Sequence, residues 1–406
     1  MTEHARYADD PAMPIGARPD PSLRGNARRV AEALRHSGPA TRAEVAARTG
    51  LSRATVSAAL SQLLDLGLVL ETGESAPGGP GGGRRPGVIR LGPRAGLAVG
   101  VDVGRQHLRA VVADLGHEVL AEVAEPSAFG QPAGPGLDRA PEMVGRALAE
   151  TGLGPVDVLG VGLGLPAPID QLTGRVSAPT ILPEWAAIHP GPELADRLGR
   201  PVLVDNDANL GALAEHLWGA GRGISTMAYV KAATGIGSGL ILDGRLFRGA
   251  AGTSGELGHI TLDEHGDVCR CGNRGCLDLV AGGNALVAML RRTHPEVAGL
   301  AQLIALAREG DGACRRIVAD AGTHVGVALG SLVNLVNPER VVIGGELGRA
   351  GEILLEPIRS ALRRVAIPPA VAAVQVVAGE LGDRSEVLGA VAVVLREPHR
   401  LTGRTP

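Results

Sequence analysis

Helical spacing of apolar residues near the N-terminus predicts three helices. Apolar side chains fall on one face of residues 26–36, and a second helix opens at Thr41 and ends at Gly50. Ser52 is a suitable N-cap for a third, longer helix that Gly67 closes. This arrangement is typical of a helix-turn-helix, and a helical hairpin that binds no DNA is the alternative.

Two short strands follow, separated by a glycine-rich loop. The strands are residues 68–71 and 88–91, and residues 73–87 hold seven glycines and three prolines. Strand, loop and strand after a helix-turn-helix predict a wing whose arginines reach phosphates or a minor groove, although a plain linker would be equally rich in glycine. With the third helix in a major groove, the predicted DNA-binding residues are Ser52, Arg53, Thr55, Ser57, Arg84 and Arg85.

The pattern changes at residue 96 to buried strands that alternate with helices rich in alanine and leucine, which predicts an α/β fold. The predicted strands are residues 97–103, 108–114, 118–123, 156–163 and 201–205. The sequence has no run of 18 apolar residues and no secretion signal near its start. We therefore expect a cytoplasmic protein without a membrane partner.

Charge is unevenly distributed along the 406 residues. The segment 22–94 holds eleven arginines and five acidic residues, a net charge of +6, whereas the whole chain carries −3. A basic segment on an acidic remainder fits a DNA-binding module joined to a small-molecule domain, with chance clustering of arginine as the alternative. The chain has only two Trp, two Tyr and two Phe, which excludes base stacking on aromatic platforms as its way of binding nucleic acid.

Three of the four cysteines lie within eight positions, at Cys269, Cys271 and Cys276. His259 adds an imidazole, which completes the four nitrogen and sulfur ligands of a closed tetrahedral zinc site. Because four protein ligands leave no position for a catalytic water, we expect a structural zinc ion. Three unrelated cysteines in a reducing compartment are the alternative.

Carboxylates flank the cysteine motif and follow a predicted strand. Glu256 and Asp278 lie on either side of the motif, where they could hydrogen-bond adjacent hydroxyls of a polyol ligand. Asn206 and Asp207 follow the strand at 201–205, where ligand sites of α/β folds collect, and Asp207 could act as a general base. An ordinary helix N-terminus explains the same cluster equally well.

These motifs together resemble the ROK family of repressors, open reading frames and sugar kinases, in its repressor branch with an N-terminal winged helix-turn-helix. The resemblance rests on Glu256-x-x-His259 with the cysteine motif, on NDAN at 206–209 and on GLGLP at 162–166. It implies an α/β body of two actin-like, ribonuclease H-like lobes with a sugar in the cleft. The sugar contacts that it implies are Asn206, Asp207, Glu256, His259 and, where the family usually has a longer glutamate, Asp278. Asp207 also falls on the catalytic base of the family's kinases.

The proline-rich, aperiodic first residues and the resemblance together imply how the chain divides into parts. The expected parts are a disordered arm (1–21), a winged helix-turn-helix (22–94), a first lobe (95–205 with 384–400) and a second lobe (206–383) that contains the zinc loop (256–278).

The sequence differs from the family's kinases at the nucleotide site. Kinases carry Asp-x-Gly-Gly-Thr in the first phosphate loop, where this chain has Asp102-Val103-Gly104-Arg105-Gln106, and Ala233 replaces the first glycine of the usual Gly-Thr-Gly. Because phosphoryl transfer needs tightly positioned ATP, these changes favour sugar binding over transfer and leave ATP and Mg²⁺ as doubtful cofactors. The remaining positions of this degenerate nucleotide site are Asp102, Gly104, Thr234, Gly235, Gly237, Gly344 and Gly345.

The preferred hypothesis is a sugar-responsive transcriptional regulator that represses genes of carbohydrate uptake or utilisation. It would bind palindromic operator DNA as a dimer or a dimer of dimers. A sugar or sugar phosphate in the cleft would shift the spacing of the paired helix-turn-helix units. The alternative is an active ATP-dependent sugar kinase, similar to glucokinases, that carries a DNA-binding arm. A zinc sensor is a third hypothesis, and the closed four-ligand site argues against it.

Overall fold

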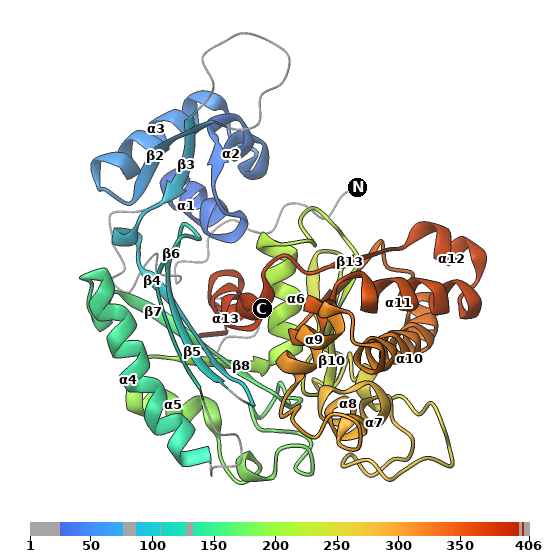
Figure 1. The fold of residues 1–406 in the computed structure, drawn as a ribbon. Coiled ribbons are helices and arrows are strands. Elements are labelled where there is room, and N and C mark those ends of the chain that lie inside the picture. Colours follow the sequence, from blue (N-terminus) through green and yellow to red (C-terminus); the bar gives the residue numbers. More distant parts are fainter. Residues whose placement is uncertain (1–24, 76–86, 106, 127–132, 398–399, 402–406) are drawn as a thin grey trace.

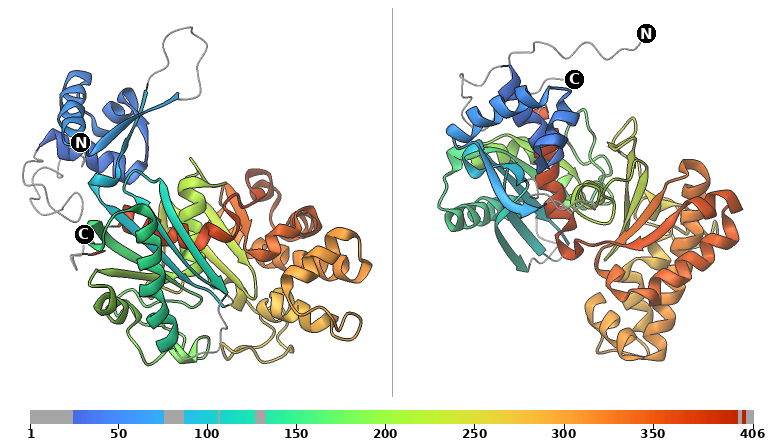
Figure 2. Two further views of the ribbon diagram at one scale, coloured as in Figure 1. Left: turned by 60° about the vertical axis from the view of Figure 1, so that its left-hand side comes forward. Right: turned by 90° about the horizontal axis from the view of Figure 1, so that it is seen from above.

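The structure is a computed structural model that describes residues 25–75, 87–105, 107–126, 133–397 and 400–401. A small helical unit lies on a body of two α/β lobes (Figure 1; Figure 2). The predicted arm at 1–21, the wing arginines Arg84 and Arg85, and Gln106 lie outside the described residues. None of the described helices is long and apolar enough to cross a membrane.

The N-terminal unit is a winged-helix arrangement of three helices and a small sheet. Thr41 and Glu44 form a capping box at the second helix, and Gly50 ends that helix with φ 66°. Ser52 Oγ accepts a 3.1 Å hydrogen bond from the Thr55 amide at the start of the third helix. These contacts confirm the predicted helix-turn-helix. The elements are α1 (Asn26–Ser37), β1 (Ala40–Thr41), α2 (Arg42–Thr49), α3 (Arg53–Asp65), β2 (Val69–Ser75) and β3 (Gly87–Leu91), with sheet order β1-β3-β2.

The first lobe is built on a five-stranded sheet of order β6-β5-β4-β7-β8, in which β4, β7 and β8 run parallel. α4 (Ala133–Thr151) and α5 (Pro190–Leu198) cover one face, and α13 (Ser385–Arg396) packs on the other (Figure 1). Because both faces are covered, the strands read as nearly continuous apolar runs. The strands match the five predicted ones and are β4 (Leu97–Val103), β5 (His107–Asp114), β6 (Val119–Pro126), β7 (Val158–Leu165) and β8 (Val202–Asn206).

The second lobe contains a sheet of order β11-β10-β9-β12-β13, with α6 (Asp207–Trp218) packed against β9 and β10. Its strands are β9 (Met227–Ala232), β10 (Ile236–Leu242), β11 (Arg245–Phe247), β12 (Arg340–Gly344) and β13 (Gln375–Ala378). Its further helices are α7 (Asp278–Ala281), α8 (Gly283–Leu290), α9 (Leu300–Glu309), α10 (Gly312–Val336), α11 (Glu352–Val365) and α12 (Pro368–Ala373). The two lobes confirm the expected actin-like fold class, and the exact domain boundaries stay predictions.

Two helices, α6 and α13, join the lobes. α13 packs on β4 and β7 of the first sheet, α6 packs on the second sheet, and the two helices pack on each other. A Cβ atom on Gly389 of α13 would lie 1.9 Å from the Leu210 carbonyl oxygen of α6. Only glycine permits this approach of the two backbones.

Replacing Gly389 with alanine is expected to destabilise the protein by about 3 kcal/mol, because the added methyl group forces the packed helices apart. Thermal unfolding followed by circular dichroism measures the effect as a Tm that falls by several degrees. Gly145→Ala in α4 is the matched control, since no heavy atom lies within 4 Å of its Cβ position. That change is expected to raise the Tm slightly, because alanine favours helix. An unchanged Tm in Gly389→Ala would contradict the close packing.

Candidate functional site

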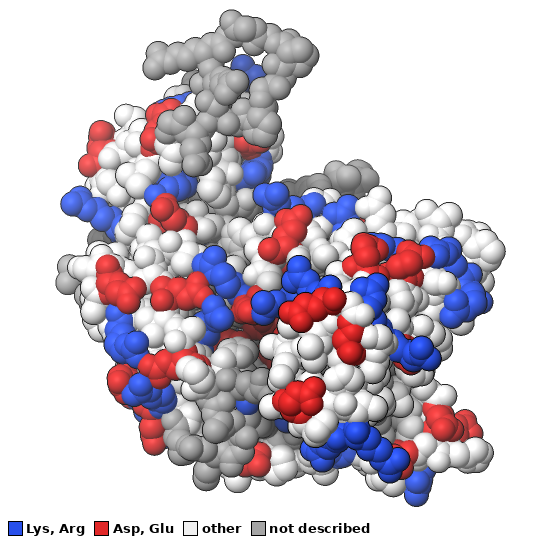
Figure 3. Space-filling view, in the orientation of Figure 1, with Lys and Arg blue, Asp and Glu red and all other residues white. Residues whose placement is uncertain are grey.

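A cavity with a volume of about 340 Å³ opens between the two lobes. Four of the five predicted sugar contacts line it: Asn206, Asp207, Glu256 and His259. Basic and acidic side chains lie side by side across the middle of the molecule, where the lobes meet (Figure 3). A cavity with carboxylate, amide and imidazole groups is suited to a ligand rich in hydroxyl groups.

The junction of β8 and α6 positions Asn206 and Asp207. The Asn206 side-chain oxygen caps α6 by accepting hydrogen bonds from the amides of Ala208 (2.9 Å) and Asn209 (3.2 Å). The Asp205 carboxylate accepts from the Asn206 amide and from the Asn209 side chain. The cluster is therefore a helix N-terminus and also part of the cavity wall. The interpretation as a helix cap and the interpretation as a ligand site are both compatible with this structure.

Lys231 on β9 lines the cavity, and the sequence interpretation missed it. Its Nζ lies 2.9 Å from Asp207 Oδ2 and 3.5 Å from Glu386 Oε1. Burial alone would lower the pKa of Lys231, but Asp207, Glu386 and Asp102 outweigh burial and raise it. The ammonium thus stays charged and neutralises Asp207. One signal was available, since Lys231 is the only lysine in a chain rich in arginine.

The degenerate nucleotide positions include the buried Asp102, which forms a second close pair with the half-buried His107. His107 Nε2 lies 2.6 Å from Asp102 Oδ2, and a Cβ atom on Gly104 would lie 2.3 Å from the His107 ring. The hydrogen bond to Asp102 raises the pKa of His107, which favours the imidazolium form. Arg105 also lines the cavity. Of the remaining nucleotide positions, Thr234, Gly235, Gly237 and Gly345 line the cavity and Gly344 lies behind it against Tyr229.

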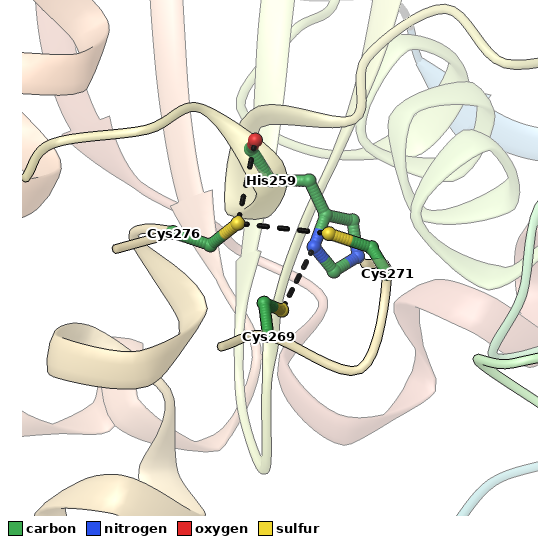
Figure 4. A group of neighbouring side chains, drawn as sticks. All are labelled: His259, Cys269, Cys271 and Cys276. Atoms are coloured by element: carbon green, nitrogen blue, oxygen red, sulfur yellow. Dashed lines mark hydrogen bonds between the residues drawn. The ribbon is translucent and has the colours of Figure 1, made fainter. Parts of the chain in front are cut away.

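The histidine and three cysteines of the predicted metal site come together (Figure 4). Their donor atoms lie within 4.8 Å of one another. Cys269 Sγ is 3.6 Å from His259 Nδ1, and Cys271 Sγ is 3.6 Å from Cys276 Sγ. Bonds of about 2.3 Å to sulfur and about 2.0 Å to nitrogen give tetrahedron edges of about 3.5–3.8 Å, so this spacing fits zinc.

Burial also affects the protonation of this cluster. Burial and the two neighbouring thiols raise the pKa of Cys276 to about 12. Because a zinc ligand must be a thiolate, binding of zinc here would release the proton of Cys276. Gly275 has φ 57°, and a Cβ atom there would lie 1.7 Å from the Asp263 carbonyl oxygen, so the tight cysteine loop requires glycine.

The histidine and cysteine cluster adjoins the cavity through His259. His259 presents Nδ1 to Cys269, and its Nε2 lies 3.9 Å from Glu256 Oε2. Burial and the nearby Asp207 raise the pKa of Glu256 to about 7. Asp278 is arranged differently and does not line the cavity. Its carboxylate accepts hydrogen bonds from the Ile236 amide (2.8 Å) and from Arg270 (3.0 Å), so it supports the cavity wall and its sugar contact stays a prediction.

The third helix presents a polar face to solvent. Arg53 and Ser57 are exposed, together with Ser61 and Gln62, while Val56 and Leu60 are buried. The hydroxyls of Ser52 and Thr55 lie 2.8 Å apart at the helix cap, so they are engaged in the absence of DNA. The exposed groups have the size and polarity to contact base edges in a major groove.

Contacts with histidine hold the N-terminal unit against the lobes. His117, in the turn between β5 and β6, donates a 2.6 Å hydrogen bond to the Arg35 carbonyl of α1. Its ring meets Trp218 of α6 edge to face, with centroids 5.6 Å apart. Burial lowers the pKa values of His117 and of His36 to about 4. Both histidines are therefore neutral at pH 7.

These histidines predict acid sensitivity of the contact. As pH falls from about 6.5 to 4, these histidines become protonated in the unfolded chain but stay neutral in the folded protein. Protonation therefore favours the unfolded chain, and the free energy of unfolding decreases across this pH window. We expect the Tm to fall between pH 7 and pH 5, measured by thermal unfolding. His117→Asn should flatten part of this dependence, because asparagine tolerates the φ of 72° at this position. An equal pH dependence in both proteins would contradict the role of His117.

Comparisons with known proteins match both parts of the chain. A model described as ROK family matches residues 98–397, and a model described as MarR family matches residues 23–79. The chain is 29% identical over 371 residues to the xylose repressor of Caldicellulosiruptor bescii, which covers 88% of this chain and 92% of the relative.

Solved structures extend the comparison. A ROK family transcriptional regulator, a homolog of the E. coli MLC protein, has a TM-score of 0.72 at 25% identity, covering 93% of this chain and 98% of that one. A ROK family glucokinase from Streptomyces griseus, in complex with glucose and AMPPNP, has a TM-score of 0.66 at 29% identity, covering 73% and 99%. Since the family model spans most of the sequence, the chain belongs to the ROK family.

Proposed function

We propose that the protein is a sugar-responsive transcriptional regulator that represses carbohydrate genes. The observation that carries this proposal is one chain that combines an exposed helix-turn-helix face with a polar cavity between two lobes. The similarity to a xylose repressor over 88% of the chain supports the combination, because it includes the N-terminal unit. The sugar would be held by Asn206, Asp207, Glu256 and His259, with Asp278 supporting the wall.

The metal of this site is proposed to be a structural zinc ion bound by His259, Cys269, Cys271 and Cys276. When bound, zinc supplies a fixed tetrahedral centre and holds three thiolates without exchangeable water. His259 would then keep Nε2 directed toward Glu256 and the sugar. The ring orientation is therefore set by the metal and used by the cavity.

Operator recognition is proposed to use two copies of α3 in successive major grooves, as in a dimer. Arg53 and Ser57 would contact bases, and Ser52 and Thr55 would contact phosphates next to the helix N-terminus. Arg84 and Arg85 would add salt-dependent contacts from the wing. Arg53→Ala is then expected to weaken operator binding about tenfold to a hundredfold without a change in Tm.

The experiment first selects an operator from random double-stranded DNA with the purified protein. Fluorescence anisotropy then follows operator binding while xylose, glucose, N-acetylglucosamine and their phosphates are added one by one. At least one of them is expected to weaken binding about tenfold. If no sequence is selected, or if no sugar or sugar phosphate weakens binding, the proposal is wrong.

A sugar kinase is the second candidate, favoured by the position of Asp207 in the cavity and by the similarity to a glucokinase. Two side chains count against it: Lys231 forms an ion pair with the Asp207 carboxylate, and the ring of His107 lies against Gly104 of the first phosphate loop. Coupled detection of ADP with the same sugars tests it. Turnover that disappears in Asp207→Asn would establish a kinase.

A further inference from the structure

The ammonium group of Lys231 connects the starts of two helices. Asp207, which it contacts at 2.9 Å, is the first residue of α6. Glu386, at 3.5 Å, lies in the first turn of α13. The three side chains are between 5% and 14% exposed, so water screens their attraction little. A single cation on β9 therefore holds both helices at the edge of the cavity.

The same two helices end against the N-terminal unit (Figure 2). Trp218, the last residue of α6, contacts His117, which donates its hydrogen bond to the Arg35 carbonyl. Arg396, the last residue of α13, lies 3.2 Å from His216 Nδ1 of α6. Side chains of α1, α6 and α13 belong to one buried core. The cavity thus lies at one end of this helix pair and the DNA-binding unit at the other. Each helix has 12 residues, so at 1.5 Å per residue its two ends are about 18 Å apart.

Close packing determines how this pair can move. Cβ atoms on Gly100 and Gly162 would lie 2.3 Å and 1.9 Å from backbone oxygens of α13, so α13 is held tightly to the first sheet. α6 packs on the second sheet, and it meets α13 most closely at Gly389 and Leu210, near the start of both helices. A movement of one lobe relative to the other about this contact would pivot near the cavity. The displacement is largest at the far ends, at Trp218 and Arg396.

We propose that Lys231 senses the sugar and that α6 and α13 carry the signal to the DNA-binding unit, an inference that rests on the proposed function of the cavity. A sugar hydroxyl that donates a hydrogen bond to Asp207 competes with Lys231 for the carboxylate. The ammonium then shifts toward Glu386, which changes the attraction between the starts of the two helices. Sugar binding thereby favours one arrangement of the pair, as a change in operator affinity requires.

The test uses a Trp185→Phe chain, in which Trp218 is the only tryptophan because the sequence contains two. Two substitutions are made in this chain. Lys231→Met removes the charge with little change in volume, and Glu386→Gln weakens the contact of Lys231 to α13 while its side-chain oxygen can still accept the hydrogen bond from Tyr229. Lys231→Arg, which keeps the charge, is the conservative control. For each protein, calorimetry measures sugar binding, the emission of Trp218 reports on the contact with His117, and anisotropy measures operator release.

In the Trp185→Phe chain we expect the sugar to shift the Trp218 emission and to weaken operator binding about tenfold. In Lys231→Met and Glu386→Gln, at a sugar concentration that calorimetry shows to be saturating for each variant, the emission shift disappears and operator binding weakens less than about twofold. Lys231→Arg restores both responses. If Lys231→Met does not fold, Glu386→Gln decides alone. A normal emission shift and normal release in the charge-removing variants overturn the proposal, whereas absent sugar binding in the parent chain overturns the function of the cavity.

Discussion

Replacing Cys276 with serine is expected to remove the proposed zinc ion and, with it, the response to sugar. Cys276 is fully buried, and a closed four-ligand site has no water ligand that could take its place. Structural zinc contributes about 10–16 kcal/mol of binding free energy, which holds the loop that carries His259 and Glu256. We expect less than a tenth of the normal zinc content by plasma mass spectrometry and sugar binding weakened more than about a hundredfold.

Cys314→Ala is the matched control for this prediction. Cys314 is the fourth cysteine, also buried, and it lies in α10 next to His294 and Asp311, outside the predicted zinc cluster. This variant should keep its zinc and its sugar response. Full zinc content in Cys276→Ser, or zinc lost from Cys314→Ala, would assign the metal to other residues.

Glu256→Gln is expected to lower sugar affinity and to raise stability at the same time. The Glu256 carboxylate lines the cavity and its pKa is raised to about 7 by burial and by Asp207. The amide loses the charge-assisted hydrogen bonds to sugar hydroxyls, each of about 1.5–3 kcal/mol, so affinity falls about tenfold to a hundredfold at pH 8. The amide also removes a carboxylate whose charge the fold disfavours, so the Tm at pH 8 should rise.

Calorimetry and thermal unfolding on the same preparation measure these opposite effects. Glu264→Gln is the control, because Glu264 is exposed in the same loop and is expected to change neither quantity. A fall in both affinity and Tm would mean that Glu256 is a structural group, and an unchanged affinity would remove it from the sugar site.

The parts of the fold and the site that could be predicted depend on neighbours in the sequence. Thr41 and Ser52 cap helices through amides three residues away, so their residue types mark the helix starts. The four metal donors fall between residues 259 and 276, and the glycine turns that gather them belong to the same segment. Buried strands can be predicted for a similar reason. A run of apolar residues identifies a buried strand even when the strand that pairs with it is not known.

The electrostatic part of the site could not be predicted in this way, because its partners are far apart in the sequence. Lys231 meets Asp207 across 24 residues, and the carboxylate of Asp278, which the sequence assigned to a sugar, accepts a hydrogen bond from the Ile236 amide across 42 residues. Whether a carboxylate faces a ligand or another side chain is decided by which elements the topology brings together. Glu386, in the last helix of the first lobe, gave no local signal at all.

The shared core of α1 and α13 also has a consequence for how the protein is made. α1 begins at Asn26 and α13 ends at Arg396, so nearly the whole chain separates two helices that pack together. The ribosome delivers the N-terminal unit first and its docking surface last, tens of seconds later at about 5–20 residues per second. A nascent chain can therefore form α3 early. The N-terminal unit can be held in its final orientation on the lobes only after α13 has been synthesised.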